Sequence, residues 1–206
     1  KTYVTSLLIA ALTAQGQRVA ARKPVESGCE NIKGELSPAD ASKLSNAAGD
    51  WEPLADICSY RFAANLAPDQ AARLAGQSLT QEQIISACTN THGSDFICIE
   101  GAGGFYSPIA ENTLNADLAT ALKHPIVLVA EDRLGTINQV LLSTEAIAKK
   151  GLALSAIFLN QQQENADIPI NNASVIRQYL DTPIYIIKHA ATELNAHPYI
   201  ETLINP

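Results

Sequence analysis

Two segments of the chain carry the residue types expected of a site for a phosphate group and a divalent cation. Each follows an apolar run: KPVESG begins at Lys23, and EGAGG begins at Glu100. A carboxylate can hold Mg²⁺ directly or through water, and glycines let backbone N–H groups approach an anion. Pro24 should end a strand and Gly28 should permit a tight turn, which would aim Lys23 and Ser27 at the edge of a sheet where ligands bind. An ordinary strand-exit loop and a glycine-rich turn without a ligand remain the alternatives.

Further candidate residues gain meaning only in combination. Lys1 and Thr2 open an apolar helical segment, as the end of a Gly-Lys-Thr phosphate-binding loop would; such a lysine reaches phosphates and such a threonine takes Mg²⁺. Asp40 lies in the first turn of a predicted helix, where stabilisation of the helix dipole is the alternative role. A helix start at 135–138 could hold a carboxylate on its N–H groups. Asn160 ends an apolar run, where its amide could read a base.

The elements that must position these residues follow from the hydrophobic pattern. Five continuous apolar runs predict strands buried on both faces of a parallel sheet, at 18–22, 95–99, 125–130, 152–159 and 183–187. Helical patterns lie between them, at 3–14, 80–91, 115–122, 137–150 and 172–180. Thr80 to Gln83 fits a capping box. The alternation predicts a three-layer α/β fold whose mostly parallel sheet is flanked by helices, with ligands at the carboxyl ends of the strands.

Other features of the sequence indicate the number of domains and the cellular compartment. We expect residues 1–206 to form a single domain, in which 29–78 contributes one or two short helices that cross one end of the sheet. Residues 1–14 resemble a secretory signal, but polar residues interrupt the run, so a buried amphipathic helix is the preferred interpretation. Four cysteines without CxxC spacing favour reduced thiols in a cytoplasmic protein over a zinc site or a disulfide framework.

Net charge and composition exclude some partners. The 14 basic and 21 acidic residues give a net charge of −7, which argues against nucleic acid or an anionic membrane as the main partner. Hydrophobic residues make up 47% of the chain, which is typical of a globular protein and not of a disordered one. A local site for phosphate stays compatible with an acidic protein, because a few lysines and backbone amides suffice.

The ordered series Lys-Thr, KPVESG, a helix Asp, EGAGG, LGTIN and LN resembles the dethiobiotin synthetase family. The resemblance continues through Tyr60-Arg61-Phe62, Pro68 and Ala116-Asp117-Leu118, and it covers residues 1–165, most of the chain. It implies a P-loop NTPase-like fold and a homodimer. It also implies that ATP, Mg²⁺ and CO₂ or bicarbonate are used to close a ureido ring on 7,8-diaminopelargonate. In that family a carbamate forms on one amine, takes the γ-phosphoryl group, and is attacked by the second amine.

The resemblance implies a role for each matching residue. Lys1 would hold the β- and γ-phosphates, and Lys23 would be the catalytic lysine that stabilises the carbamate and the transferring phosphoryl group. Ser27 would contact the diamine. The magnesium ligands would be Thr2, Asp40 and Glu100. The nucleotide would also contact Gly101, Ala102, Gly103 and Asn160, the last reading the adenine. The substrate carboxylate would be anchored across a dimer interface by Gly135, Thr136, Ile137 and Asn138.

Two departures from the family pattern leave alternatives open. The roughly six loop residues that should precede Lys-Thr, and the strand before them, are absent. We expect the natural polypeptide to carry them upstream; the rival is a fragment without useful ATP affinity. The family's Gly-x-Ile-Pro adenine loop has no match at 186–189, so no residue is carried over there. The alternative functions are an amide-forming ligase of the cobyrinate diamide synthetase type and an inactive nucleotide-binding paralogue. A role for Cys29 beyond packing is left open.

Overall fold

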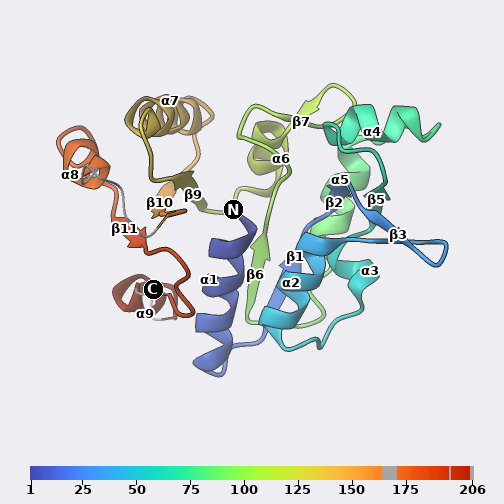
Figure 1. Cartoon of the computed structure of the whole chain (residues 1–206), viewed down its shortest axis with the longest axis horizontal. Coiled ribbons are helices and arrows are strands. Elements are labelled where there is room, and N and C mark those ends of the chain that lie inside the picture. Colours follow the sequence, from blue (N-terminus) through green and yellow to red (C-terminus); the bar gives the residue numbers. More distant parts are fainter. Residues whose placement is uncertain (164–170, 195, 205–206) are drawn as a thin grey trace. The chain divides into compact units, whose positions relative to one another are not determined.

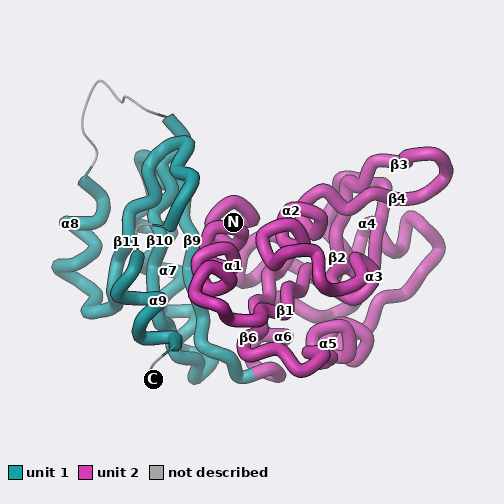
Figure 2. Tube along the Cα trace, turned by 90° about the horizontal axis from the view of Figure 1, so that it is seen from below, with its two compact units in different colours: residues 1, 123–206 teal, residues 2–122 magenta. Residues whose placement is uncertain are grey.

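Parallel strands alternate with helices along the chain, as the hydrophobic pattern predicts (Figure 1). The computed structural model describes residues 1–163, 171–194 and 196–204. The chain divides into two compact units, which Figure 2 shows in different colours: unit 2 is 2–122, and unit 1 is residue 1 with 123–206. Among the described residues, no helix has the length and apolar character needed to cross a bilayer.

In unit 2, a pair of parallel strands supports the first two helices. β1 (Val19–Arg22) pairs in parallel with β6 (Phe96–Ile99). α1 (Thr2–Ala14) packs against α2 (Ala39–Ala48), and α2 also packs on β1. α1 buries the side chains of Val4, Leu7, Leu8, Ile9 and Leu12. This burial confirms the interpretation of the N-terminal apolar run as a buried helix.

A second pair of parallel strands in unit 2 lies over its own apolar cluster. β2 (Val25–Ser27) pairs with β5 (Tyr60–Phe62). α5 (Gln81–Thr89) begins with the predicted capping box, in which Thr80 and Gln83 satisfy each other's backbone N–H. α4 (Pro68–Leu74) and α6 (Asn115–Leu122) complete this layer. The cluster between them consists of Val25, Phe62, Ala71, Ala72, Leu79, Ile84, Cys88, Ile109, Ala110 and Leu118.

The expectation for 29–78 is wrong in detail. The segment contains three helices, α2, α3 (Leu54–Ile57) and α4, where one or two were predicted. It also contains β5 and the antiparallel hairpin of β3 (Glu30–Ile32) and β4 (Glu35–Ser37). A further unpredicted hairpin joins β7 (Pro108–Ala110) to β8 (Thr113–Leu114). These strands are short, and β3 is exposed throughout, so they leave no hydrophobic period in the sequence.

Unit 1 is a parallel sheet with helices on both faces. β9 (Ile126–Glu131), β10 (Leu154–Asn160) and β11 (Ile184–Ile187) lie in the order β11–β10–β9. Figure 1 shows α7 (Thr136–Lys149) and α9 (His197–Ile204) on opposite sides of these strands. α8 (Asn172–Ile176) packs beside α7 and ends four residues before the predicted boundary at 180.

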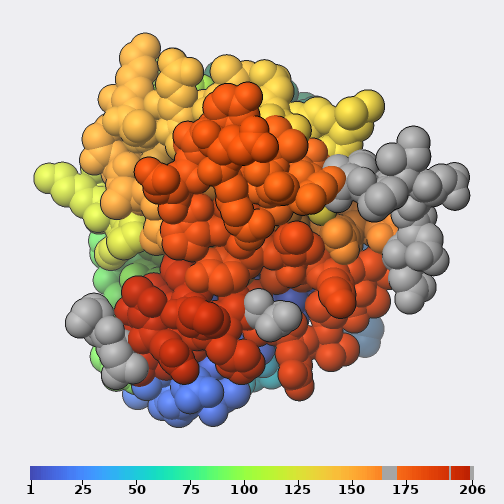
Figure 3. Space-filling model, turned by 90° about the vertical axis from the view of Figure 1, so that its left-hand side faces the viewer, coloured from blue at the N-terminus to red at the C-terminus, as the bar shows by residue number. Residues whose placement is uncertain are grey.

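Successive side chains of β10 point to opposite faces of this sheet. Ile157 and Leu159 join the cluster under α7 and α8, together with Val140, Ala173, Ile176 and Ile184. Phe158 points the other way, and its ring centroid lies 5.2 Å from that of Tyr185 and 5.8 Å from that of Tyr199 on α9. Residues 171–194 and 196–204, orange to red, form most of the face of unit 1 seen in Figure 3. Burial on both faces explains why these strands are continuous apolar runs.

Candidate active site

The ends of β1 and β6 bring a lysine and a glutamate together. Arg22 and Ile99 are paired at the ends of the two parallel strands, so the residues that follow leave the sheet side by side. The Glu100 N–H donates to the Arg22 carbonyl oxygen at 2.8 Å, which fixes this exit. Nζ of Lys23 then lies 2.7 Å from Oε1 of Glu100. Two residues that the sequence analysis placed at strand ends therefore lie in direct contact.

Asp40 and Thr2 complete the cluster from two helices. Asp40 lies in the first turn of α2, and its Oδ2 is 3.2 Å from Nζ of Lys23. The Thr2 hydroxyl, at the start of α1, donates to Oε1 of Glu100 at 2.7 Å. Four side chains that the sequence analysis selected therefore meet at one place, although their roles stay predictions.

Burial and opposite charge act against each other on the ionisable groups here. Burial on its own would lower the pKa of Lys23, but the carboxylates of Glu100 and Asp40 outweigh it and hold that pKa above its ordinary value. Burial would likewise raise the pKa of Asp40, but the Lys23 ammonium outweighs it and holds that pKa below its ordinary value. Lys23 is therefore an ammonium and Asp40 a carboxylate at neutral pH. A cation held between two anions provides fixed charge and not a proton acceptor.

The donor set of this cluster fits a magnesium ion. Oε2 of Glu100 is buried and has no hydrogen-bond partner. With the Asp40 carboxylate and the Thr2 hydroxyl it forms a set of hard oxygen donors, which Mg²⁺ prefers. Among the described residues, no group of three or more His, Cys, Asp or Glu side chains is arranged to hold a metal ion. Water or a bound phosphate would therefore supply the remaining ligands, as is usual for Mg²⁺.

The glycine loop after Glu100 is held by a residue that the sequence analysis missed. Nδ2 of Asn115 donates to the carbonyl oxygens of Ala102 at 2.7 Å and Gly104 at 3.1 Å. A Cβ at Gly101 would clash with Oδ1 of Asn115, so a larger residue there would force the Asn115 side chain out of this arrangement. Gly103 has φ +81°, which favours glycine. In the sequence, the one indication of this role was that Asn115 directly precedes Ala116-Asp117-Leu118, a segment of the family resemblance.

Ser27 and Cys29 make contacts of their own outside the charged cluster. The Ser27 hydroxyl donates to the Leu66 carbonyl oxygen at 2.7 Å, so a substrate would have to displace or share this bond. Gly28 has φ +76°, which confirms the predicted turn. The buried Cys29 thiol donates to the carbonyl oxygen of Glu26 at 3.4 Å. Burial raises the pKa of this thiol, which favours its protonated form.

The remaining predicted residues belong to unit 1. Gly135, with φ +91°, precedes α7 as predicted. Thr136 is fully buried, and its hydroxyl donates to the Glu131 carbonyl oxygen and accepts from the Arg133 N–H at 3.2 Å. Its side chain is therefore committed to the loop. Ile137 packs against the cluster under α7, whereas Asn138 is exposed.

Asn160 and Lys1 are the other two unit 1 candidates. Asn160 ends β10, is 6% exposed and carries a buried Oδ1 without a hydrogen-bond partner. An unsatisfied buried acceptor of this kind suits a ligand that donates a hydrogen bond. Lys1 is exposed.

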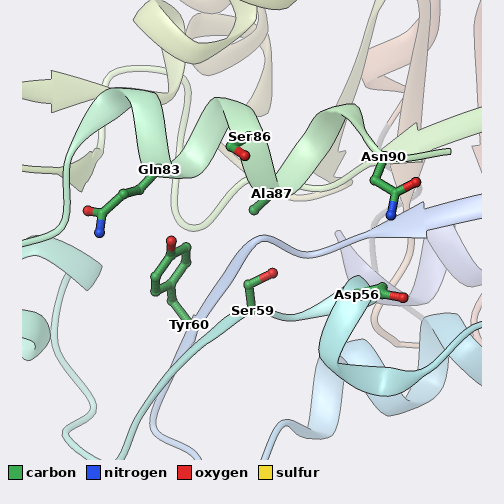
Figure 4. A pocket seen from close by; sticks show the side chains of 7 residues that line it. All are labelled: Asp56, Ser59, Tyr60, Gln83, Ser86, Ala87 and Asn90. Carbon is green, nitrogen blue, oxygen red and sulfur yellow. The ribbon is translucent and has the colours of Figure 1, made fainter.

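A polar pocket of about 290 Å³ lies elsewhere in unit 2, between α5 and the segment from α3 to β5 (Figure 4). It is lined by Asp56, Ser59, Tyr60, Gln83, Ser86, Ala87 and Asn90. None of the predicted site residues lines it. Apart from Ala87 and the ring of Tyr60, its lining side chains are polar, whereas small-molecule sites are usually lined mostly by apolar and aromatic groups. The charged cluster is therefore the better candidate for the active site.

Comparisons with known proteins show the family to which the chain belongs. Residues 1–188 match the family described as AAA domain, so the class is that of an AAA-type domain with parallel strands flanked by helices. Several ATP-dependent dethiobiotin synthetases are similar to this chain over most of their length. The one from Ruthia magnifica is 41% identical over 90% of this chain and 84% of its own. That of Anaeromyxobacter sp. strain K is 37% identical over 91% and 83%. That of Rhodopirellula baltica is 34% identical over 89% and 77%.

The chain belongs to the dethiobiotin synthetase family. The predicted family resemblance and the predicted P-loop NTPase-like α/β class are thereby confirmed. Membership makes the chain an enzyme of the ATP-dependent ligases of biotin biosynthesis.

Proposed function

We propose that this protein is an ATP- and Mg²⁺-dependent dethiobiotin synthetase that acts on 7,8-diaminopelargonate and CO₂. The observation that carries the proposal is the Lys23 ammonium held between the carboxylates of Asp40 and Glu100, on the scaffold of that family. The cluster supplies fixed charge of both signs at one place. Phosphoryl transfer depends chiefly on such positioning and charge neutralisation.

The proposed reaction forms its bonds largely between the substrates' own groups. One amine attacks CO₂ and loses a proton to give a carbamate. A carbamate oxygen attacks the γ-phosphorus of ATP and releases ADP. The second amine then attacks the carbonyl carbon, expels phosphate, loses a proton and so closes the ureido ring. Lys23 would neutralise the negative charge of the carbamate and of the phosphoryl group in transfer, since its raised pKa keeps it protonated.

The other residues bind and orient. Thr2, Asp40 and Glu100 would hold Mg²⁺, which neutralises phosphate charge when it is bound. Lys1 would contact the β- and γ-phosphates, and Ser27 the diamine. The backbone of 101–103 would line the nucleotide or the diamine.

The nucleotide base and the substrate carboxylate would be held by unit 1 residues. Oδ1 of Asn160 would accept a hydrogen bond from the adenine amino group, since that oxygen is buried without a partner. The helix start at 135–138 would hold the carboxylate through backbone N–H groups, because the Thr136 side chain is committed elsewhere. In this proposal the carboxylate comes from a substrate bound in the other half of a homodimer, and the enzyme works in the cytoplasm.

The test is ADP release by the purified full natural chain. We expect ADP and dethiobiotin only when the diamine and bicarbonate are both present, with glutamine unable to replace either. ADP release that needs glutamine would support an amide-forming ligase instead. Nucleotide binding with no turnover under any combination would support the inactive paralogue.

A further inference from the structure

α2 lacks a capping side chain at its own N-cap position, and the carboxylate of Glu26, on β2, caps the helix instead. The residue at the N-cap position is Pro38, which makes no side-chain cap hydrogen bond. Instead, Oε1 of Glu26 accepts from the N–H of Asp40 at 2.9 Å, and Oε2 accepts from the N–H of Ala41 at 3.0 Å. One carboxylate thus satisfies two of the N–H groups that a helix start leaves open.

The geometry makes this a strong contact. Glu26 is 7% exposed, so water competes little for its oxygens. Hydrogen bonds to an ionised acceptor are stronger than neutral ones, and a negative charge at a helix N-terminus is favoured by the helix dipole. Glu26 is itself fixed, because β2 is paired with β5 and the Glu26 carbonyl oxygen accepts from the Cys29 thiol.

The helix turn that Glu26 holds carries Asp40. The strand segment therefore contacts Asp40 twice: Lys23 pairs with its carboxylate at 3.2 Å, and Glu26 binds its backbone N–H at 2.9 Å. A helix start fixed by backbone contacts leaves the Asp40 carboxylate little freedom to move away from Lys23. Such fixation of ligands before binding lowers the free energy needed to assemble a site.

We propose that Glu26 is a positioning residue that sets the place of Asp40 and so pre-forms the binding site for Mg²⁺ and the ATP phosphates. This inference rests on the proposed function for the nature of the ligand. It concerns a residue inside KPVESG that neither the motif nor the family resemblance assigned.

The substitution Glu26→Gln tests the inference, because it keeps the side-chain size and replaces one acceptor oxygen with an NH₂ group that faces an N–H. Glu26→Ala removes both acceptors. The matched control is Thr80→Ala, which removes the cap of α5, a helix that carries no site residue. Both kinds of variant should lower Tm by a few degrees, roughly as the loss of a helix cap does in a chain of this size.

Three measurements separate positioning from simple stability. Amide hydrogen exchange at Asp40 and Ala41 should speed up by about tenfold or more in Glu26→Gln, as expected for lost charge-assisted hydrogen bonds. The Kd of ATP, measured by calorimetry at fixed Mg²⁺, should rise about tenfold. In turnover, the Mg²⁺ concentration for half-maximal rate should rise while KM for the diamine stays unchanged. Thr80→Ala should leave all three at wild-type values.

Each result of these measurements either supports the role of Glu26 or overturns it. Unchanged exchange at Asp40, or a Glu26→Gln variant that binds ATP at fixed Mg²⁺ as tightly as wild type, would overturn the inference. An equal loss of ATP affinity in Thr80→Ala would overturn it too, since the effect would then be one of stability. A wild-type chain without diamine-dependent ADP release would refute the proposed function alone, because exchange and ATP binding still decide the role of Glu26. If Glu26→Ala does not fold, Glu26→Gln gives the decision.

Discussion

The ammonium nitrogen of Lys23 lies 2.7 Å from Oε1 of Glu100, although the two residues are 77 positions apart in the chain. Their side chains are only 5% and 3% exposed. The pair forms where two parallel strands end in register, and Thr2 donates to the same oxygen. Oε1 of Glu100 is therefore fully used within the protein, whereas Oε2 is left for a ligand.

Removal of the lysine should affect the chemical step. We expect Lys23→Ala to lower kcat by about 10²–10³-fold, as loss of one group that stabilises transition-state charge does. Lys23→Arg keeps the charge but not the compact ammonium, so its kcat should lie between that of the wild type and that of Lys23→Ala. Steady-state formation of dethiobiotin measures both. Product formation by Lys23→Ala at the wild-type rate would refute the assignment of Lys23 as the catalytic lysine.

Glu100→Gln should weaken the use of magnesium. The substitution keeps the size of the side chain but removes the charge that would bind the cation, so the Mg²⁺ concentration for half-maximal rate should rise about tenfold. It also removes the carboxylate that most strongly raises the pKa of Lys23, so that pKa should fall. Glu111→Gln, on an exposed carboxylate, is the control. Equal magnesium curves for Glu100→Gln and the control would argue against a metal ligand at Glu100.

Two buried thiols should make the protein less stable at high pH. Burial raises the pKa of Cys58 and of Cys88 from 9.0 to about 12. Between these values the unfolded chain releases thiol protons that the folded chain retains, so the free energy of unfolding falls as pH rises. The loss at pH 10 should be roughly 1 kcal/mol per thiol.

Urea unfolding at pH 8 and pH 10 measures this effect. The double variant Cys58→Ala, Cys88→Ala provides the comparison, because it lacks both thiols and should lose less stability between the two pH values. An equal loss in wild type and double variant would show that these thiols keep ordinary pKa values in the folded chain.

The buried ion pair of Arg22 and Glu52 should be costly to break. Arg22 is fully buried and makes two hydrogen bonds to the Glu52 carboxylate, at 2.8 and 3.0 Å. Glu52→Gln leaves that guanidinium without a counter-charge, and should lower the free energy of unfolding by about 3–5 kcal/mol. Urea unfolding measures the change. The double variant Arg22→Met, Glu52→Leu should lose less, because it buries no unpaired charge. A loss below about 1 kcal/mol in Glu52→Gln would mean that the pair behaves like an exposed one.

The regular elements could be predicted because their signals are local. Strands buried on both faces read as continuous apolar runs, and all five predicted runs are strands. The capping box at Thr80 was likewise visible, because its two partners are three residues apart. The hairpin of β3 and β4 gave no signal, since an exposed strand of three residues has no apolar period. The chain divides into two compact units, and the expectation that they form a single domain stays a prediction.

The sequence by itself determined the strand–helix alternation and which residue types follow each strand. It placed Lys23 and Glu100 at strand ends, because Pro24 and the glycines mark where the ladders stop. Only the tertiary structure decided that Asp40 and Thr2 reach the same point, that Asn115 holds the glycine loop, and that Glu26 caps α2. These contacts join residues far apart in the chain. Which strands become neighbours, and which side chains then meet, depends on the packing of the whole unit and leaves no periodic mark in the sequence.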